Sequence, residues 1–168
     1  NLNLSVIIFP TLSSSKKQTI LAFDNVEIYI NSKGSSAIRI GDKSIFIKEP
    51  LILRSWYKIN VKISLSGNVS ISQKNIKNYN EKELINDGKM LLKKVISGKV
   101  SLAANVSKGI GYNHFNGKIE SPSIKADGKK IGDWDLSKNT SSTFVDSIKG
   151  PKLLLKNFPT RAVTGSKW

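Results

Sequence analysis

The chain has 168 residues, a formal net charge of +15 and no cysteine, and 39% of its residues are hydrophobic. This length corresponds to one ordinary domain with enough core to fold unaided. The lack of cysteine excludes disulfides, cysteine nucleophiles and thiolate metal sites. No run of 18 apolar residues is present, so we expect no membrane span and no membrane partner.

Lysine carries nearly all of the positive charge. Only three of the 27 basic residues are arginines: Arg39, Arg54 and Arg161. Arginine is the usual residue for bidentate contacts to phosphates and bases, and neither a recognition helix nor an RNP-like aromatic motif accompanies the lysines. We therefore expect a basic, solvated surface without specific nucleic-acid binding. Weak attraction for anions and true nucleic-acid or lipid binding are the lesser alternatives.

Apolar and polar residues alternate with period two along most of the chain, which predicts β-strands. In the first half, strands are expected over residues 2–9, 18–23, 26–30, 37–40, 44–47, 56–63 and 69–73. The strand over 56–63 alternates most regularly. The Ser-Gly-Asn turn at 66–68 joins it to the next strand as a hairpin.

The pattern changes in the second half. Asn80 as N-cap and two glutamates in the first turn predict a short helix over 80–87, which Gly88 would end.

Residues 90–96 are apolar and basic without a clear period. The Gly109-Ile110-Gly111 segment has no following helix and no P-loop lysine, so a turn is favoured over a phosphate cradle. Further strands are expected over 100–106, 114–119, 123–126 and 131–136.

About ten to twelve short strands with Gly and Asn turns predict an all-β fold, an antiparallel β-sandwich. We place the sandwich in residues 1–136, with Pro122 at an edge or at the end of a strand. The alternation stops after Leu136. Residues 137–168 are expected to form an extended tail or linker toward a following domain.

Two stretches resemble the concanavalin A-like, laminin G-like jelly rolls. Trp56-Tyr57 begins a strand that a glycine turn joins to the next, and residues 115–120 (FNGKIE) are similar to the strand that closes these sandwiches. The C-terminal part is more specific. Residues 134–137 (WDLS) and 157–168 (NFPTRAVTGSKW) resemble the large (β) subunit of the N,N-dimethylformamidase family, with Leu136 and Val163 replacing a phenylalanine and a methionine.

The resemblance implies an iron-dependent amide hydrolase of the cytoplasm. Its tyrosine and glutamate metal ligands would lie in a following catalytic domain, so no catalytic or metal-binding residue is carried over to this chain. The chain itself would be a non-catalytic accessory sandwich that buttresses the catalytic domain or mediates subunit contacts. Its expected partners are that catalytic domain or other subunits, and it would need no cofactor of its own.

Four aromatic residues are candidates for a sugar-stacking platform: Trp56, Tyr57, Tyr112 and Trp134. The alternative is that the tryptophans pack at the rim of the sandwich, with their indole N–H groups bonded locally. A lectin-like carbohydrate-binding module, with glycan as its partner, is therefore the alternative function.

The acidic residues offer only weak metal or catalytic sites. Asp133 and Asp135 point to the same side of a strand, while Asp24, Asp42 and Asp127 each lie in an expected turn. Calcium needs five or more oxygen ligands, so calcium is a lesser alternative to an ordinary surface role. A glycosidase would need two facing acids, which the strand segments lack.

Two single residues complete the candidates. His114 has no second histidine or cysteine nearby, so a structural role is favoured over a ligand contact. Arg161 lies in an arginine-poor chain and is expected to have a bidentate partner. We expect Arg161 to anchor the tail to the sandwich or to the next domain.

Overall fold

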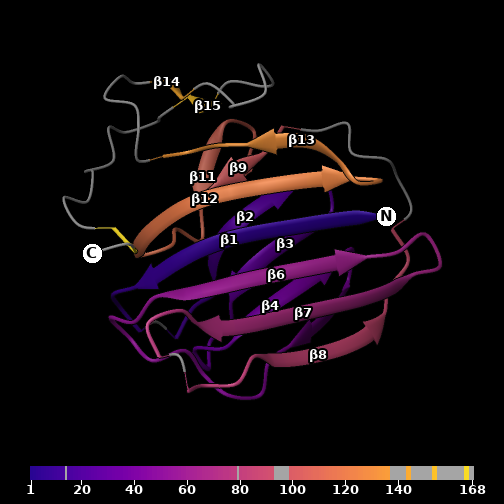
Figure 1. The fold of residues 1–168 in the computed structure, drawn as a ribbon. Coiled ribbons are helices and arrows are strands. Elements are labelled where there is room, and N and C mark those ends of the chain that lie inside the picture. Colours follow the sequence, from indigo (N-terminus) through magenta and orange to yellow (C-terminus); the bar gives the residue numbers. More distant parts are fainter. Residues whose placement is uncertain are drawn as a thin grey trace.

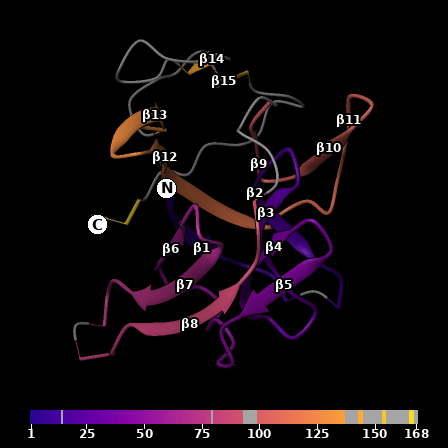
Figure 2. The ribbon, with the colours of Figure 1, turned by 90° about the vertical axis from the view of Figure 1, so that its right-hand side faces the viewer.

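The computed structural model describes residues 1–13, 15–78, 80–92, 99–136 and 165–166, and the backbone of residues 143–144 and 153–154. The described residues form an all-β fold in which two antiparallel sheets face each other (Figures 1 and 2). The predicted β-sandwich is therefore confirmed. No helix long and apolar enough to cross a membrane occurs among the described residues.

The six-stranded sheet has the order β13-β12-β1-β6-β7-β8 and lies at the front of Figure 1. Every neighbouring pair in it is antiparallel. Its strands are β1 (Leu2–Pro10), β6 (Tyr57–Ile63), β7 (Asn68–Asn75), β8 (Leu84–Lys89), β12 (Gly117–Ala126) and β13 (Lys129–Asp133).

The five-stranded sheet has the order β5-β4-β3-β2-β9 and faces the first sheet, as Figure 2 shows in edge view. Its strands are β2 (Gln18–Phe23), β3 (Val26–Ile30), β4 (Ser36–Ile40), β5 (Lys43–Phe46) and β9 (Ser101–Leu102). The short strands β10 (Asn105–Ser107) and β11 (Ile110–Tyr112) form a hairpin beside this sheet, and β14 (Thr143–Phe144) pairs with β15 (Leu153–Leu154).

The core lies between the sheets and follows from the alternation. Each strand turns one set of residues inward, and burying one such aliphatic side chain contributes about 1.5–3 kcal/mol. The inward residues of the two sheets, each at most 4% exposed, include Leu2, Leu4, Val6, Ile8, Ile59, Val61, Ile63, Val69, Ile71, Val26, Ile28, Ile30, Ile38 and Ile40.

One hydrogen bond links the two sheets through the core. The Ser36 hydroxyl on β4 donates to the Gln73 side-chain oxygen on β7 over 2.7 Å, and both residues are at most 2% exposed. Among the described residues, every buried side-chain nitrogen and oxygen has a hydrogen-bond partner. Because an unpaired polar group in the interior is costly, the Ser36–Gln73 bond favours the observed placement of the two sheets.

The helix predicted over 80–87 is wrong, since β8 occupies Leu84–Lys89 and pairs with β7. The free edge of β7 offers a complete ladder of backbone partners, and this tertiary pairing outweighs the local capping signals. Gly88 therefore does not end a helix. A Cβ on Gly88 would lie 2.8 Å from Cγ2 of Ile45, so glycine lets β8 approach β5 closely.

The later strands also differ in detail. The strand expected over 100–106 is divided into β9 and β10, with Ala103 at a φ of 61° between them. The turn expected at residues 109–111 sits one residue earlier, because Lys108 and Gly109 have positive φ and join β10 to β11. The strands expected over 114–119 and 123–126 form one strand, β12, which begins at Gly117.

Pro122 lies in the middle of β12, where a bulge interrupts the pairing with β1. Ser5 pairs with Ser123 and Ile7 with Glu120, so β12 has an extra residue there, and Ser121 has a φ of 45°. A bulge tolerates a residue without an N–H donor. Pro122 therefore marks a bulge in a strand with neighbours on both sides, rather than the edge or strand end that the sequence indicated.

Candidate functional site

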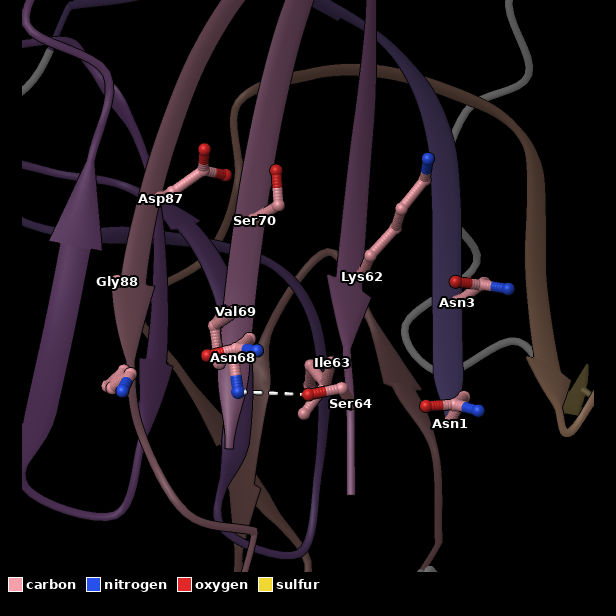
Figure 3. A pocket seen from close by; sticks show the side chains of 11 residues that line it. Asn1, Asn3, Lys62, Ile63, Ser64, Asn68, Val69, Ser70, Asp87 and Gly88 are labelled. Carbon is pink, nitrogen blue, oxygen red and sulfur yellow. Dashed lines mark hydrogen bonds between the residues drawn. The ribbon is translucent and has the colours of Figure 1, made fainter. Parts of the chain in front are cut away.

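The outer face of the six-stranded sheet carries a row of polar side chains at right angles to the strands. The register aligns Asn3 with Lys62, Lys62 with Ser70, and Ser70 with Asp87, and it places Lys125 on the other side of Asn3. Directly paired residues hold their Cβ atoms about 4.5–5.5 Å apart, so neighbouring side chains can share one ligand. Figure 3 shows four of these side chains on the same side of the sheet.

A second row lies next to the first and is linked by hydrogen bonds. The Ser5 hydroxyl donates to the Asn60 side-chain oxygen over 2.9 Å, and the Asn60 side-chain amide donates to the Ser72 hydroxyl over 3.3 Å. This network spans β1, β6 and β7 and holds the Asn60 amide in one orientation. Ser5 and Asn60 are half-buried and keep further donor or acceptor capacity toward solvent, whereas Ser72 is buried and supports the Asn60 amide.

A cavity of about 720 Å³ lies along the first row, on the side away from the second row (Figure 3). Asn1, Asn3, Lys62, Ser70 and Asp87 line it, together with the turn between β6 and β7, where the Asn68 N–H donates to the Ser64 hydroxyl over 2.9 Å. The lining has amide, hydroxyl, ammonium and carboxylate groups, includes the apolar residues Ile63 and Val69, and has no aromatic ring. Such a surface offers polar partners to the hydroxyl groups of a ligand and apolar contact to its carbon atoms.

The structure does not gather the four predicted aromatic residues into an exposed platform. Trp56, Tyr57 and Trp134 are 7%, 1% and 1% exposed, whereas Tyr112 is 43% exposed on β11. The Tyr57 hydroxyl accepts a hydrogen bond from the Ile52 backbone N–H over 3.1 Å. Burial raises the pKa of Tyr57.

The two buried tryptophans have identifiable packing partners. The Trp56 ring lies 5.0 Å from the Phe9 ring between centroids. Trp134 covers Gly132, where a Cβ would lie 2.2 Å from its ring, and its backbone N–H donates to the Pro122 oxygen over 3.1 Å. The tryptophans are thus part of the packing of the sandwich, the alternative weighed from the sequence.

The candidate metal ligands are spread over the molecule. Asp24, Asp42 and Asp127 occupy the β2–β3, β4–β5 and β12–β13 turns, and Asp127 pairs with the terminal ammonium of Asn1 at 2.6 Å. Asp133 pairs with Lys130. In the described part of the chain, no three His, Cys, Asp or Glu side chains are grouped so that they could hold a metal ion. His114 is exposed and lies against Gly111.

Sequence reasoning missed one ionic cluster, on the outer face of the five-stranded sheet. The Glu27 side chain is 0% exposed, and its carboxylate accepts hydrogen bonds from the Thr19 hydroxyl (2.6 Å), the Lys17 ammonium (2.8 Å) and the Arg39 Nε (3.0 Å). Burial alone would raise the pKa of Glu27, but the bonds from Lys17, Thr19 and Arg39 lower it below its ordinary value. The alternation shows that Glu27 points away from the core but not which residues cover it.

The tail approaches the sandwich at Glu120 on β12. The backbone N–H of Ser166 donates to both carboxylate oxygens of Glu120, at 3.0 and 3.2 Å, and the Ser166 hydroxyl donates to the same group. A Cβ on Gly165 would lie 2.5 Å from a Glu120 oxygen, so glycine permits this approach. Arg161, the predicted anchor, lies outside the described residues.

Comparisons with known proteins show the fold. No family model and no curated protein matches the chain. A crystal structure titled "putative carbohydrate binding protein" from Bacteroides ovatus ATCC 8483 matches with a TM-score of 0.66 and 10% identity, over 88% of this chain and 49% of that one. A heptameric SAP-like pentraxin from Limulus polyphemus matches with a TM-score of 0.53 and 15% identity, over 73% and 62%.

The chain thus spans about half the length of the first protein and under two thirds of the second. At 10% and 15% identity the likeness concerns the arrangement of strands. It agrees with the all-β, antiparallel order of the two sheets. The chain has the β-sandwich jelly-roll fold of the concanavalin A-like type.

Proposed function

We propose that this chain is a non-catalytic accessory β-sandwich of a dimethylformamidase-like amide hydrolase, and that it buttresses the catalytic domain or mediates subunit contacts. One observation carries the proposal: Ser166, which belongs to the stretch 157–168 that resembles that family, is hydrogen-bonded to Glu120 on β12 of the sandwich. A segment held on the sandwich in this way would set where a following domain begins.

The iron implied by the resemblance does not fit the described residues of this chain. No three His, Cys, Asp or Glu side chains are grouped there, and Glu27 and Glu120 are already bonded to other side chains. On this proposal the metal and the hydrolytic chemistry belong to the catalytic domain. The sandwich contributes position and stability.

The test starts from the native polypeptide of the source cells, whose length is measured by intact mass and western blot. We expect a longer chain that contains bound iron and hydrolyses an amide such as dimethylformamide. In that protein, Glu120→Gln should speed proteolysis of the segment around Ser166, while Glu49→Gln, at an exposed site, should not. A native chain that ends near Trp168 and has no associated amidase would overturn the proposal.

A second candidate function is carbohydrate binding, which the outer face of the six-stranded sheet favours. The half-buried Ser5 and Asn60 side chains, held by the bonds to each other and to the buried Ser72, and the adjacent cavity of about 720 Å³ present oriented donors and acceptors to solvent. Preoriented groups lose little entropy when a sugar hydroxyl replaces water. A neighbour in fold is described as a "putative carbohydrate binding protein", which supports this candidate.

Glycan binding is tested on a broad panel of neutral and acidic oligosaccharides, with and without calcium. Asn60→Ala should abolish or strongly weaken the binding, because it removes the amide that links the two serines. Ser44→Ala, at an exposed position on the other sheet, is the matched control. Absence of binding to every glycan would refute this candidate and would leave the accessory role untouched.

A further inference from the structure

We propose that the outer face of the six-stranded sheet binds an acidic polysaccharide, one that bears carboxylate or sulfate groups; this inference rests on the second proposed function. The lysines on this face include these four: Lys58 and Lys62 on β6, Lys74 on β7 and Lys125 on β12. Three of them are exposed and Lys125 is half-buried. None of the four forms an ion pair with another described residue.

The register brings like charges together. Lys58 on β6 and Lys74 on β7 are direct cross-strand partners in the register. Like charges directly opposite each other destabilise a sheet, so this pairing is a local cost for the free protein. A bound anion between the two ammonium groups would relieve that cost.

The lysines also have a spacing that favours a polymer over a single small anion. Lys58 and Lys62 lie four residues apart on one strand, which is about 13 Å. The Ser5, Asn60 and Ser72 network lies between them. A chain of sugars along β6 would therefore place acidic groups at the two lysine positions and neutral hydroxyls at the network.

Asp87 is expected to orient the bound sugar. It stands in the same row as Lys62, across Ser70, and lines the cavity. A carboxylate accepts hydrogen bonds from sugar hydroxyls and repels a second carboxylate or sulfate. Asp87 should therefore fix the direction in which the charged sugar lies, with its acid group toward Lys62.

The experiment compares three oligosaccharides of equal length by titration calorimetry at 150 mM NaCl: an oligogalacturonate, a sulfated galactan fragment and a neutral galacto-oligosaccharide. The site variant is Lys58→Gln with Lys74→Gln. The control variant, Lys33→Gln with Lys43→Gln, removes the same charge from exposed positions outside this face. We expect one of the acidic ligands to bind and the site variant to weaken it about tenfold, about threefold per solvent-exposed contact.

The outcomes separate the alternatives. The two acidic ligands distinguish a carboxylate-bearing from a sulfate-bearing partner. Equal weakening in both variants, or equal binding of the acidic and neutral ligands, would overturn the inference while carbohydrate binding stands. No binding of any sugar would overturn both. Tighter binding of single-stranded DNA, lost in the site variant, would assign the face to nucleic acid instead.

Discussion

The buried carboxylate of Glu27 gives the sharpest prediction about stability. Replacing Glu27 by Gln keeps the shape of the side chain and removes its charge. The Lys17 and Arg39 cations then face a neutral amide, although each is about a third exposed, at 31% and 34% of its side chain. Both cations can turn partly toward water. The substitution therefore costs less stability than it would for a fully enclosed ion pair.

Removing one partner of a buried ion pair costs about 3–5 kcal/mol. We expect the lower end, about 3 kcal/mol, because the two cations regain some hydration. In a chain of 168 residues, this lowers the melting temperature by about 6–12 °C. Thermal and urea unfolding followed by circular dichroism measure the difference, with Glu49→Gln at an exposed site as the control.

The pH dependence follows from the lowered pKa of Glu27. A carboxylate whose folded-state pKa is depressed adds stability that is complete above its unfolded pKa and lost as pH falls through the folded value. The difference between the native protein and Glu27→Gln should thus be full at pH 7 and shrink in the range below 4.5. A Glu27→Gln protein within about 0.5 kcal/mol of the native one at pH 7, the scatter of ordinary surface substitutions, would refute the reasoning.

Two further substitutions test the packing between the sheets. Gly88→Ala should destabilise by about 1–3 kcal/mol in urea unfolding, because its Cβ meets Ile45 at 2.8 Å. The cost should largely vanish in an Ile45→Ala background, and a cost that persists there contradicts the close approach. Ser36→Ala should cost about 1–3 kcal/mol, since it leaves the Gln73 oxygen buried without its 2.7 Å donor. An unchanged urea midpoint would show that this bond contributes nothing to the free energy of unfolding.

Strand positions in the first half were predictable because most of these strands place apolar residues at every second position, on the face that turns to the core. In β6, the residues expected to point together, Tyr57, Ile59, Val61 and Ile63, are all buried, while Lys58 and Lys62 are exposed. A period of two is a local property, so it survives without knowledge of the neighbours. The helix predicted over 80–87 failed because that decision depended on the free edge of β7, the preceding strand, which lies outside the short window that sets helical preference.

The candidate site was not predictable from the sequence, because its residues become neighbours only through the register in which the strands pair. Ser5, Asn60 and Ser72 are isolated polar residues in three separate strands and carry no motif. The aromatic residues that drew attention in the sequence are mostly core residues, since large rings are recruited to packing as readily as to ligands. Of the four candidate aromatic residues, only Tyr112 is exposed.

By itself, the sequence determined the all-β class, the inward face of most strands and the absence of cysteine chemistry, because these depend on composition and on a repeat of two residues. Apart from the hairpin of β6 and β7, which its turn signals, only the tertiary structure decided which strands pair. The register of the paired strands buried Glu27 under Lys17 and Arg39 and set Lys58 opposite Lys74. Such contacts join residues from different strands, and the free energy of a whole sheet, rather than any local preference, fixes their register.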